Sequence, residues 1–287
     1  MLTFDPKKVS TPKLHGLLLG AIGPRPIAFA STIDDKGNPN LSPYSFFNVF
    51  SANPPILIFS PARRVRDNSI KHTLENVEQV KEVVINVVNY NIVQQMSLSS
   101  TEYAKGVNEF EKAGLTMVKS DLVKPYRVGE SPVQFECEVK EIIKLGNEGG
   151  AGNLIMAQVV KIHVNENVVD REGKIDQHKI DQVARMGGNW YTRATAGMFE
   201  VPKPLSSIGI AIDSLPKEIR ESTILTGNDL GKLGNIASLP TNEEVTAFAE
   251  KNKNFSTFTL EQKHQKAKEL LSQDRNTEAL LLLLYNT

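Results

Sequence analysis

Residues 26–38 of the chain are Pro26-Ile-Ala-Phe-Ala-Ser-Thr-Ile-Asp-Asp-Lys-Gly-Asn38, a β-type run that leads into a turn signal. The β-branched and aromatic residues up to Ile33, which are Ile27, Phe29, Thr32 and Ile33, favour a strand. The residues from Asp34 to Asn38 are those that tight turns prefer. Two strands flanking this turn would form a β-hairpin.

Similar short runs recur up to about Pro204, separated by Gly, Pro, Asn and Asp. The clearest are Ile56 to Ser60, Val83 to Val88, Phe135 to Ile143 and Leu154 to Val164. Asn147 to Gly152 is a glycine-rich break that could join the last two strands as a second hairpin. This repetition predicts an antiparallel barrel or sandwich. No Gly-x-Gly-x-x-Gly follows a strand to open a helix, which argues against a dinucleotide-binding Rossmann domain.

Helices are expected between the strands and after them. Within the β-rich part we expect helices over Ser69 to Lys81 (capped by Asp67 or Asn68), Gln94 to Ser100 and Asn108 to Ala113. After Pro202-Lys-Pro204 the pattern changes, and helix starts are indicated at Asp213-Ser-Leu-Pro216 and at Ser238-Leu-Pro-Thr241. Leu260 to Leu284 is leucine-rich at roughly helical spacing. The prediction is therefore a β-rich domain over residues 1–204 and an α-helical region over 205–287.

Composition narrows the classes of partner. Lys+Arg and Asp+Glu both number 33, so the formal net charge is +0, which gives no electrostatic footprint for nucleic acid or an anionic membrane. Cys137 is the single cysteine, which excludes an intramolecular disulfide and a cysteine-based zinc site. The longest apolar run, Ala279 to Tyr285, is too short to span a bilayer. With no signal-peptide pattern at the N-terminus, the cytoplasm is the expected location.

The first candidate segment is Gly23-Pro-Arg-Pro-Ile-Ala-Phe-Ala-Ser-Thr32, followed after the turn by Asn40-Leu-Ser-Pro-Tyr-Ser-Phe-Phe-Asn48. In its second stretch, polar groups crowd among three aromatic residues. In a structural interpretation Ser-Pro is a turn and the phenylalanines belong to the core. In a functional interpretation a flat, partly polar ring stacks on the segment and bonds to its side chains and backbone N–H groups. The residue types alone leave both interpretations open.

The second candidate segment runs from Phe59 to Thr73. The end of a strand presents Ser60, three arginines follow at positions 63, 64 and 66, and a helix start adds Lys71 and Thr73. A helix N-terminus with nearby cations is a ready anion site, and the planar arginine fork suits phosphate. A solvated basic loop is the plainer interpretation, and without further support it is preferred.

The third candidate segment is Val183-Ala-Arg-Met-Gly-Gly-Asn-Trp-Tyr191, which contains the single tryptophan. Its glycine pair implies a close backbone approach or an unusual turn. Its aromatic residues could belong to the core or to a binding surface. The five histidines show no metal-ligand spacing, so no metal site is expected. No Gly-x-Ser-x-Gly elbow supports a serine hydrolase.

Taken in order, these segments resemble the flavin reductase-like family, whose fold is the FMN-binding split barrel. Matching stretches, over roughly residues 10–200, are Arg25 to Thr32, Asn40 to Asn48, Asn53-Pro-Pro55, Lys71-His-Thr-Leu-Glu-Asn76, Asn108 to Leu115, Glu130 to Glu138 and Arg185-Met-Gly-Gly188. The resemblance implies a mainly β fold, a six-stranded antiparallel barrel, with FMN near the interface of a homodimer. The helical region after Pro204 is additional to the family pattern.

The resemblance also implies the site. Ser45, Phe46 and Asn48 would line the isoalloxazine ring of FMN. Ser60, Arg66, Lys71 and Thr73 would bind the ribityl chain or the phosphate. Arg185 and Tyr191 would complete the site, from the same subunit or its partner. NADH or NADPH would be the hydride donor, and a small-molecule substrate or a redox partner protein would accept the electrons.

Two departures from the family pattern and two alternatives accompany this expectation. His72 stands where the family usually has Asp, and Met156-Ala-Gln158 replaces a more usual Gly-Glu pair. The main alternative is a flavoredoxin-like electron-transfer protein with little NAD(P)H activity of its own. The other is a split-barrel binding protein that has lost FMN, against which Ser45, Asn48, Arg66 and Lys71 count.

Overall fold

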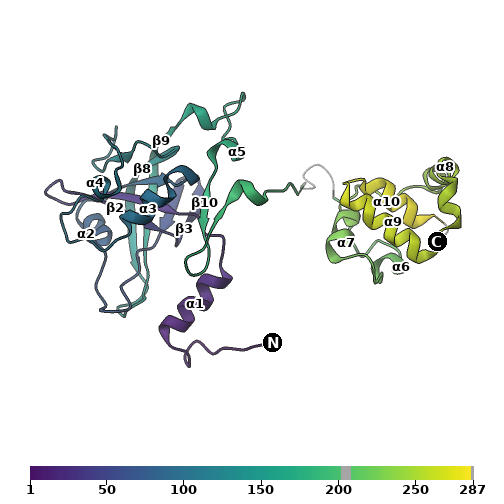
Figure 1. Ribbon diagram of the computed structural model, residues 1–287, viewed down its shortest axis with the longest axis horizontal. Coiled ribbons are helices and arrows are strands. Elements are labelled where there is room, and N and C mark those ends of the chain that lie inside the picture. The colour runs from purple at the N-terminus through teal and green to yellow at the C-terminus, as the bar shows by residue number, and fades with distance from the viewer. Residues whose placement is uncertain (202–207, 286–287) are drawn as a thin grey trace. The chain divides into compact units, whose positions relative to one another are not determined.

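The computed structural model describes residues 1–201 and 208–285 of the chain. The chain folds into two compact units, Met1–Met198 and Phe199–Thr287 (Figure 1). The boundary that the sequence predicts after Pro204 lies outside the described residues.

The first unit is built on one large antiparallel sheet. Its strands, in hydrogen-bonding order, are β2 (Pro39–Tyr44), β1 (Ala28–Ile33), β5 (Glu82–Val87), β8 (Val133–Lys144), β9 (Asn153–Val164), β4 (Pro55–Phe59) and β3 (Phe47–Ala52). The expected hairpins are present, with β1 and β2 around Asp34 to Asn38 and β8 and β9 around the glycine-rich break.

The sheet curls into a barrel that is open along one seam. Its two edge strands, β2 and β3, lie at opposite ends of the hydrogen-bonding order, yet only Ser45 and Phe46 separate them in the sequence. The three residue steps from Tyr44 to Phe47 span at most about 11 Å, so the two edges must approach each other there. The expected split β-barrel is confirmed. The sheet has seven strands where the resemblance implies six, because Ser45 and Phe46 leave the ladder and divide this part of the chain into two strands.

Strand β1 is buried on both faces because its alternate side chains point into two different cores. Ala28 and Ala30 belong to the barrel interior, with Leu57 and Phe59 of β4. Phe29 points the other way, into a second core that includes Met96 and Phe110 of the covering helices. The opening stretch of sequence therefore forms the wall between the two cores.

The smaller elements of the first unit surround this sheet. The helices are α1 (Thr11–Ala21), α2 (His72–Gln79), α3 (Val93–Ser99), α4 (Glu109–Ala113) and α5 (Gln177–Ile180), with 3₁₀ turns η1 (Tyr90–Ile92), η2 (Glu166–Val168) and η3 (Ala194–Gly197). Two short ribbons pair β6 (Met117–Val118) with β7 (Arg127–Val128), and β10 (Val183–Arg185) with β11 (Tyr191–Arg193).

Two features of these helices differ from the expectation. Helix α2 begins at His72 and not near Asn68, because the carboxylate of Asp67 accepts from the backbone N–H and hydroxyl of Ser69 and so closes a local turn. Helix α1 is not among the helices that the sequence predicts. None of its residues is buried, although Leu17 and Leu18 are among its apolar side chains.

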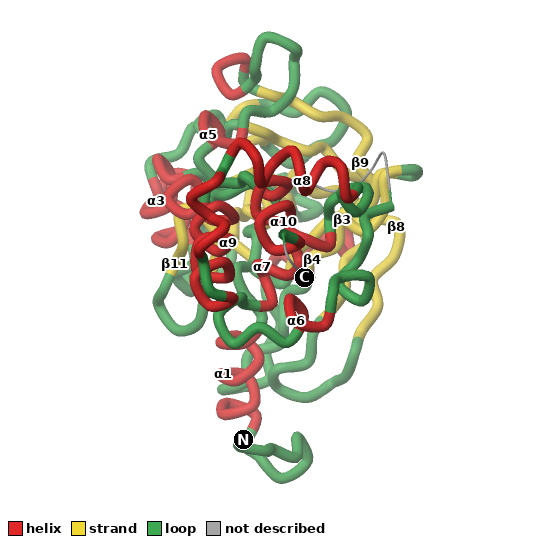
Figure 2. The backbone as a smooth tube through the Cα atoms, turned by 90° about the vertical axis from the view of Figure 1, so that its right-hand side faces the viewer, coloured by secondary structure: helices red, strands yellow, loops and turns green. Residues whose placement is uncertain are grey.

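The second unit is helical where it is described, as expected (Figure 2). Its elements are α6 (Lys217–Arg220), α7 (Gly227–Gly234), α8 (Asn242–Lys251), η4 (Lys253–Thr257), α9 (Leu260–Ser272) and α10 (Asn276–Leu284). The expected start at Thr241 is present as a capping box with Glu244. The stretch from Leu260 to Leu284 forms two helices, because Asp274 takes a left-handed conformation with φ 57° and ends the first helix.

Candidate functional site

The link between β2 and β3 brings the three candidate segments together. The hydroxyl of Tyr44 donates to Thr73 Oγ1 at 2.9 Å. The hydroxyl of Ser45 accepts from Arg25 Nε at 3.5 Å. The carbonyl of Phe46 accepts from the backbone N–H of Ser60 at 2.9 Å. Tyr44 and Phe46 therefore contact the second candidate segment, through Thr73 and Ser60. Ser45, which lies between them, contacts Arg25, and Arg25 pairs with Arg185 of the third segment.

A cationic hollow lies on the Thr73 side of this link. Its lining includes Ser42 and Tyr44 of β2, and Arg64, Lys71 and Thr73 from the second candidate segment. Ser99 at the end of α3, the residues from Ser100 to Tyr103, and the carboxylate of Glu109 on α4 also line it. Arg64 is held in place, since its guanidinium also donates to Ser69 Oγ and to the carbonyl of Ile70. Lys71 is the N-cap residue of α2 and makes no side-chain capping hydrogen bond. Burial, and then the neighbouring Arg64, lower the pKa of Lys71.

Arg66 lies at the outer edge of this cationic group. Its side chain is 71% exposed, against 17% for Arg64. The carboxylate of Glu102 joins the group: Oε1 accepts from Arg64 Nε at 2.9 Å, Oε2 accepts from Arg66 at 2.8 Å, and Lys71 Nζ lies 3.7 Å away. Three cations therefore converge on one anion at the start of α2.

The hydroxyls of Thr73 and Ser60 are buried and already bonded. Thr73 Oγ1 accepts from Asn40 Nδ2 at 2.9 Å as well as from Tyr44. Ser60 Oγ accepts from the backbone N–H of Asn153 at 3.0 Å. In this arrangement both hydroxyls fix the walls of the site by tying β4 to β9 and α2 to β2.

A second polar group lies at the other side of the link. Arg25 is buried, and its guanidinium donates to the carbonyls of Leu19, Ile22 and Met186. Its backbone exchanges two hydrogen bonds with Arg185, whose own guanidinium lies 4.5 Å from the ring centroid of Tyr191. Burial, and then Arg185, lower the pKa of Arg25. No carboxylate of the described residues forms an ion pair with either arginine.

Phe46 and Asn48 are exposed beside this group. The ring of Phe46 meets His15 of α1 edge-on, with centroids 6.3 Å apart. Asn48 Oδ1 accepts from the backbone N–H of Val49 at 2.8 Å. An aromatic ring and an amide therefore lie close to Ser45 in the chain: Phe46 follows it in the link, and Asn48 belongs to the edge strand β3.

Of the nine predicted residues, Lys71 and Thr73 line the cationic hollow, and Arg66 joins it through Glu102. Ser45 and Arg185 bond to Arg25, and Tyr191 contacts Arg185. Ser60 bonds to the carbonyl of Phe46, and Phe46 and Asn48 follow Ser45 closely in the chain. Sequence reasoning did not single out Glu102 or the inward position of Arg64. Glu102 stands alone in a loop without a motif, and only the fold brings it to the arginines.

These residues have the chemistry that suits a ligand with a phosphate group and a flat polar ring, as a flavin nucleotide has. A phosphate needs cations and hydrogen-bond donors, which Arg64, Lys71 and the start of α2 supply. A flat ring with polar edges needs an aromatic surface beside polar side chains, which the link and its neighbours supply. The two requirements are met on either side of consecutive residues, since Tyr44 contacts Thr73 and Ser45 contacts Arg25.

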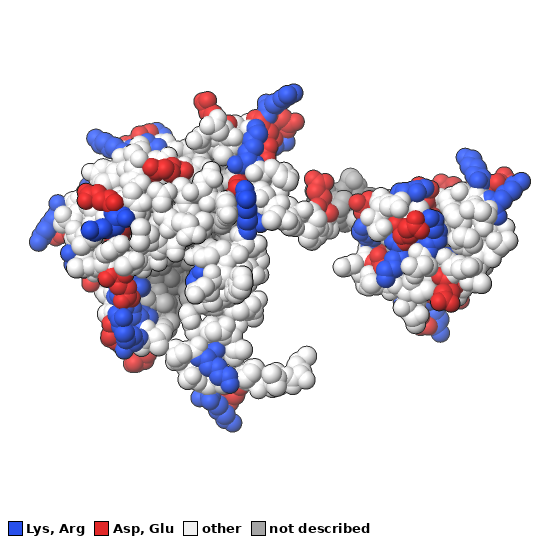
Figure 3. Space-filling model, viewed as in Figure 1, with Lys and Arg blue, Asp and Glu red and all other residues white. Residues whose placement is uncertain are grey.

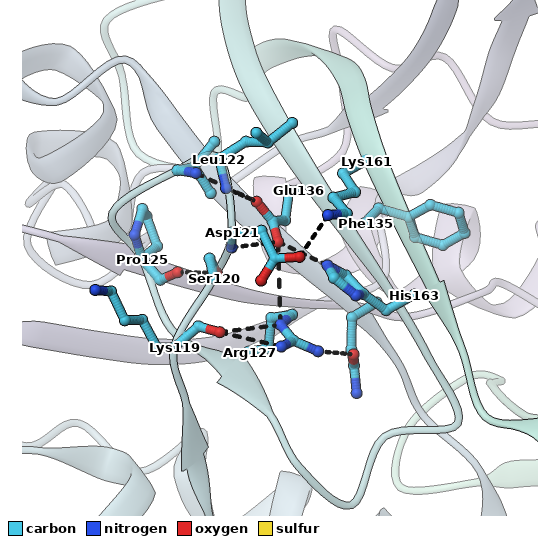
Figure 4. A network of polar contacts seen from close by, with 12 residues as sticks. Lys119, Ser120, Asp121, Leu122, Pro125, Arg127, Phe135, Glu136, Lys161 and His163 are labelled. Atoms are coloured by element: carbon cyan, nitrogen blue, oxygen red, sulfur yellow. Dashed lines mark hydrogen bonds and ion pairs between the residues drawn. The ribbon is translucent and has the colours of Figure 1, made fainter.

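A second polar network surrounds Glu136 on the outer side of β8 (Figure 4). Its carboxylate accepts from the backbone N–H groups of Asp121, Leu122 and Val123, and from His163 Nε2 at 2.7 Å. Burial alone would raise the pKa of Glu136, but these donors outweigh it and lower that pKa. Asp121, Glu136 and His163 have the residue types of a metal site. However, the Glu136 oxygens are already used by backbone donors, which makes the network a structural clamp.

The charges on the face shown in Figure 3 do not form a basic patch that would attract a large anionic partner. Acidic and basic side chains are intermixed on the face of each unit shown in Figure 3. Within residues 1–201 and 208–285, no helix has the length and hydropathy that a membrane span requires.

Comparison with known proteins decides the family. A family model described as the flavin reductase like domain matches residues 21–179, which is more than half of the chain. This chain belongs to the flavin reductase-like family. The match lies entirely within the first unit and contains seven of the nine predicted site residues.

Individual relatives agree with the family. An uncharacterized protein of Aquifex aeolicus is 35% identical over 193 residues, which cover 67% of this chain and 96% of that protein. Nitrilotriacetate monooxygenase component B from Bacillus cereus superposes with a TM-score of 0.66 at 28% identity, over 70% of this chain and 98% of that one. A Shewanella frigidimarina protein with a split barrel domain gives a TM-score of 0.59 at 27% identity, over 71% and 100%. Membership of the flavin reductase-like family makes this chain a flavin-related oxidoreductase.

Proposed function

We propose that the chain binds FMN across the β2–β3 link and that NADH or NADPH reduces it there. The observation that carries the proposal is the place where β2 passes into the link: Tyr44, the last residue of β2, lines the cationic hollow, and Ser45 contacts Arg25. A ligand with an anionic end and a flat polar ring matches these two groups and their adjacency.

The residues of the chain supply binding, orientation and electrostatics. Arg64 and Lys71 would hold the phosphate as charge-assisted donors. Ser45 and Asn48 would bond the polar edges of the ring, with Phe46 and Tyr191 as its apolar neighbours. The positive charge of Arg25 and Arg185 would favour an electron-rich carbonyl edge. When bound, the flavin itself supplies the hydride-transfer chemistry, so no general acid or base is required of the protein.

We also propose that the acceptor of the electrons is a redox partner protein or a small-molecule substrate. The Bacillus cereus protein is, by its name, one component of a monooxygenase. A flavoredoxin-like carrier with little NAD(P)H activity remains the alternative, and the arrangement of the site serves both.

A homodimer is part of the proposal. Edge strand β3 exposes Val49 and Phe50, each 63% accessible, and α1 exposes Leu17 and Leu18. Unpaired edges and grouped apolar side chains of this kind are surfaces that soluble chains cover. A second copy of the chain would cover them beside the flavin site.

An absorbance spectrum of the purified protein, recorded before and after anaerobic addition of NADH, tests the function. We expect flavin bands that bleach with NADH, and FMN on denaturation. Flavin bands that persist with NADH and with NADPH would favour the electron carrier. No flavin bands, even after reconstitution with FMN, would refute the proposal.

The phosphate position has its own test. Lys71→Ala should weaken FMN binding by about tenfold, the scale of one lost charge-assisted contact, and leave riboflavin binding unchanged. Lys71 is chosen over Arg64 because the Arg64 guanidinium also holds the loop before α2, through Ser69 and the carbonyl of Ile70. Lys140→Ala is the control, since Lys140 is exposed on β8 and pairs with Glu138. Equal losses for FMN and riboflavin would contradict the assignment.

A further inference from the structure

Glu102 holds the position that the anion of a ligand would take in the cationic hollow. Its two oxygens accept from Arg64 at 2.9 Å and from Arg66 at 2.8 Å, and Lys71 lies at 3.7 Å. Arg64 and Lys71 line the hollow, and Arg66 reaches it from outside through the carboxylate of Glu102 that the three cations share.

A carboxylate and a phosphate compete for the same donors. Both accept from guanidinium N–H groups through paired oxygen atoms. The N–H group of Arg64 that donates to Glu102 cannot at the same time donate fully to a phosphate. Lys71 would likewise be shared between two anions that repel each other.

The position of Glu102 in the fold allows it to be displaced. It lies in the loop between α3 and α4, is 44% exposed, and has no place in any apolar core cluster of the described residues. A separate ion pair between Lys105 and Glu75, at 2.7 Å, ties the same loop to α2. The loop would therefore keep an attachment to α2 when the carboxylate leaves.

We propose that Glu102 is a specificity-determining residue that competes with the flavin phosphate for Arg64, Arg66 and Lys71. This inference rests on the proposed function. Binding of FMN requires the carboxylate to leave the three cations, whereas binding of riboflavin, which has no phosphate, does not. Glu102 therefore lowers the advantage of FMN over riboflavin and keeps FMN exchangeable, as suits a flavin that acts as a substrate.

The test compares Glu102→Gln with the wild-type protein in the affinity for FMN and for riboflavin, each followed by quenching of flavin fluorescence. Glutamine keeps the size and removes the charge. We expect the dissociation constant for FMN to fall by about tenfold, since several exposed ion pairs of modest strength are involved. The constant for riboflavin should not change. High salt should reduce the difference between the two proteins.

Glu78→Gln is the matched control. It removes the same charge from helix α2, but Glu78 pairs with Lys144 at 2.8 Å, so neither the three cations nor the loop that carries Glu102 loses a partner. An equal gain in this control would assign the effect to overall charge and overturn the inference.

The remaining outcomes distinguish a failure of this inference from a failure of the proposed function. If both flavins bind and Glu102→Gln leaves FMN affinity unchanged or weaker, Glu102 does not compete, and only the inference fails. If neither flavin binds to either protein, the proposed function fails and the inference fails with it.

Discussion

At the scale of single residues, Glu136 shows how a charged side chain can be buried in a stable way. Its side chain is fully buried, yet backbone N–H groups and His163 satisfy its oxygens. When one partner of such a network is removed, the buried polar groups that remain lose a hydrogen bond, and their desolvation cost is no longer offset. The buried hydroxyls of Thr73 and Ser60 are likewise bonded to neighbouring strands, so they hold the walls of the site in place.

The first prediction concerns Glu136. Glu136→Gln turns an amide N–H₂ toward backbone donors, and it should lower the free energy of unfolding at neutral pH by about 2 kcal/mol. Urea unfolding followed by circular dichroism measures this. Glu138→Gln, on the exposed face of the same strand, should have little effect.

The pH dependence of this effect follows from the lowered pKa of Glu136. Below its ordinary value of 4.5, the unfolded chain binds the proton first, so the stabilisation is complete above that pH and is lost as the pH falls through the folded pKa. The difference between Glu136→Gln and wild type should therefore shrink in acid. A difference that stays constant down to acid pH would contradict the clamp.

At the scale of elements, the attachment of α1 depends on backbone proximity and on one arginine. A Cβ atom at Gly187 would lie 3.2 Å from the Cα of Gly20, so the loop after β10 approaches the end of α1 closely. Arg25 adds hydrogen bonds to carbonyls on both sides of this contact. Without a buried face of its own, α1 relies on these ties.

The second prediction is that Gly187→Ala loosens α1. Amide hydrogen exchange over residues 11–22 should accelerate by about fivefold, which corresponds to about 1 kcal/mol, while exchange in β8 stays unchanged. Gly197→Ala is the control, because a Cβ atom there meets nothing within 4 Å. Unchanged exchange in α1 would mean that the close approach does not hold it.

At the scale of the whole molecule, each unit has its own apolar core. The second unit buries Leu271 and Leu280 among leucines contributed by α7, α9 and α10. The family match ends before this unit begins. We therefore propose that the helical unit folds independently of the first unit.

The third prediction follows from these separate cores. Leu271→Ala should destabilise the helical unit by about 3 kcal/mol, the usual cost of a cavity. Hydrogen exchange should rise across α7, α9 and α10 and remain unchanged in the barrel strands. Leu260→Ala, on the same helix but 53% exposed, is the control. Faster exchange in β1 or β5 would show that the two units fold as one.

The fourth prediction concerns assembly. Phe50→Lys places a charge on the exposed apolar edge of β3, and it should convert a wild-type dimer into a monomer in light scattering after gel filtration. Ile175→Lys, also at an exposed apolar position, should leave the dimer intact. A monomeric wild-type protein would overturn the proposed dimer.

The sequence by itself determined the local structure. Alternation and turn residues were sufficient for the two hairpins, because strand periodicity and turn chemistry are properties of neighbouring residues. The capping box at Thr241 could be predicted for the same reason. The resemblance to the family, carried by ordered motifs, indicated the split barrel and the segments around which the candidate site is built.

The tertiary structure decided what depends on distant partners. The choice of Arg64 over Arg66 as the inward arginine, and the arrival of Glu102 beside both, follow from packing of a loop 36 to 38 residues away in the chain. A single glutamate in a loop forms no sequence motif. Its role depends on the charged side chains that the fold brings next to it, so the sequence alone does not predict that role.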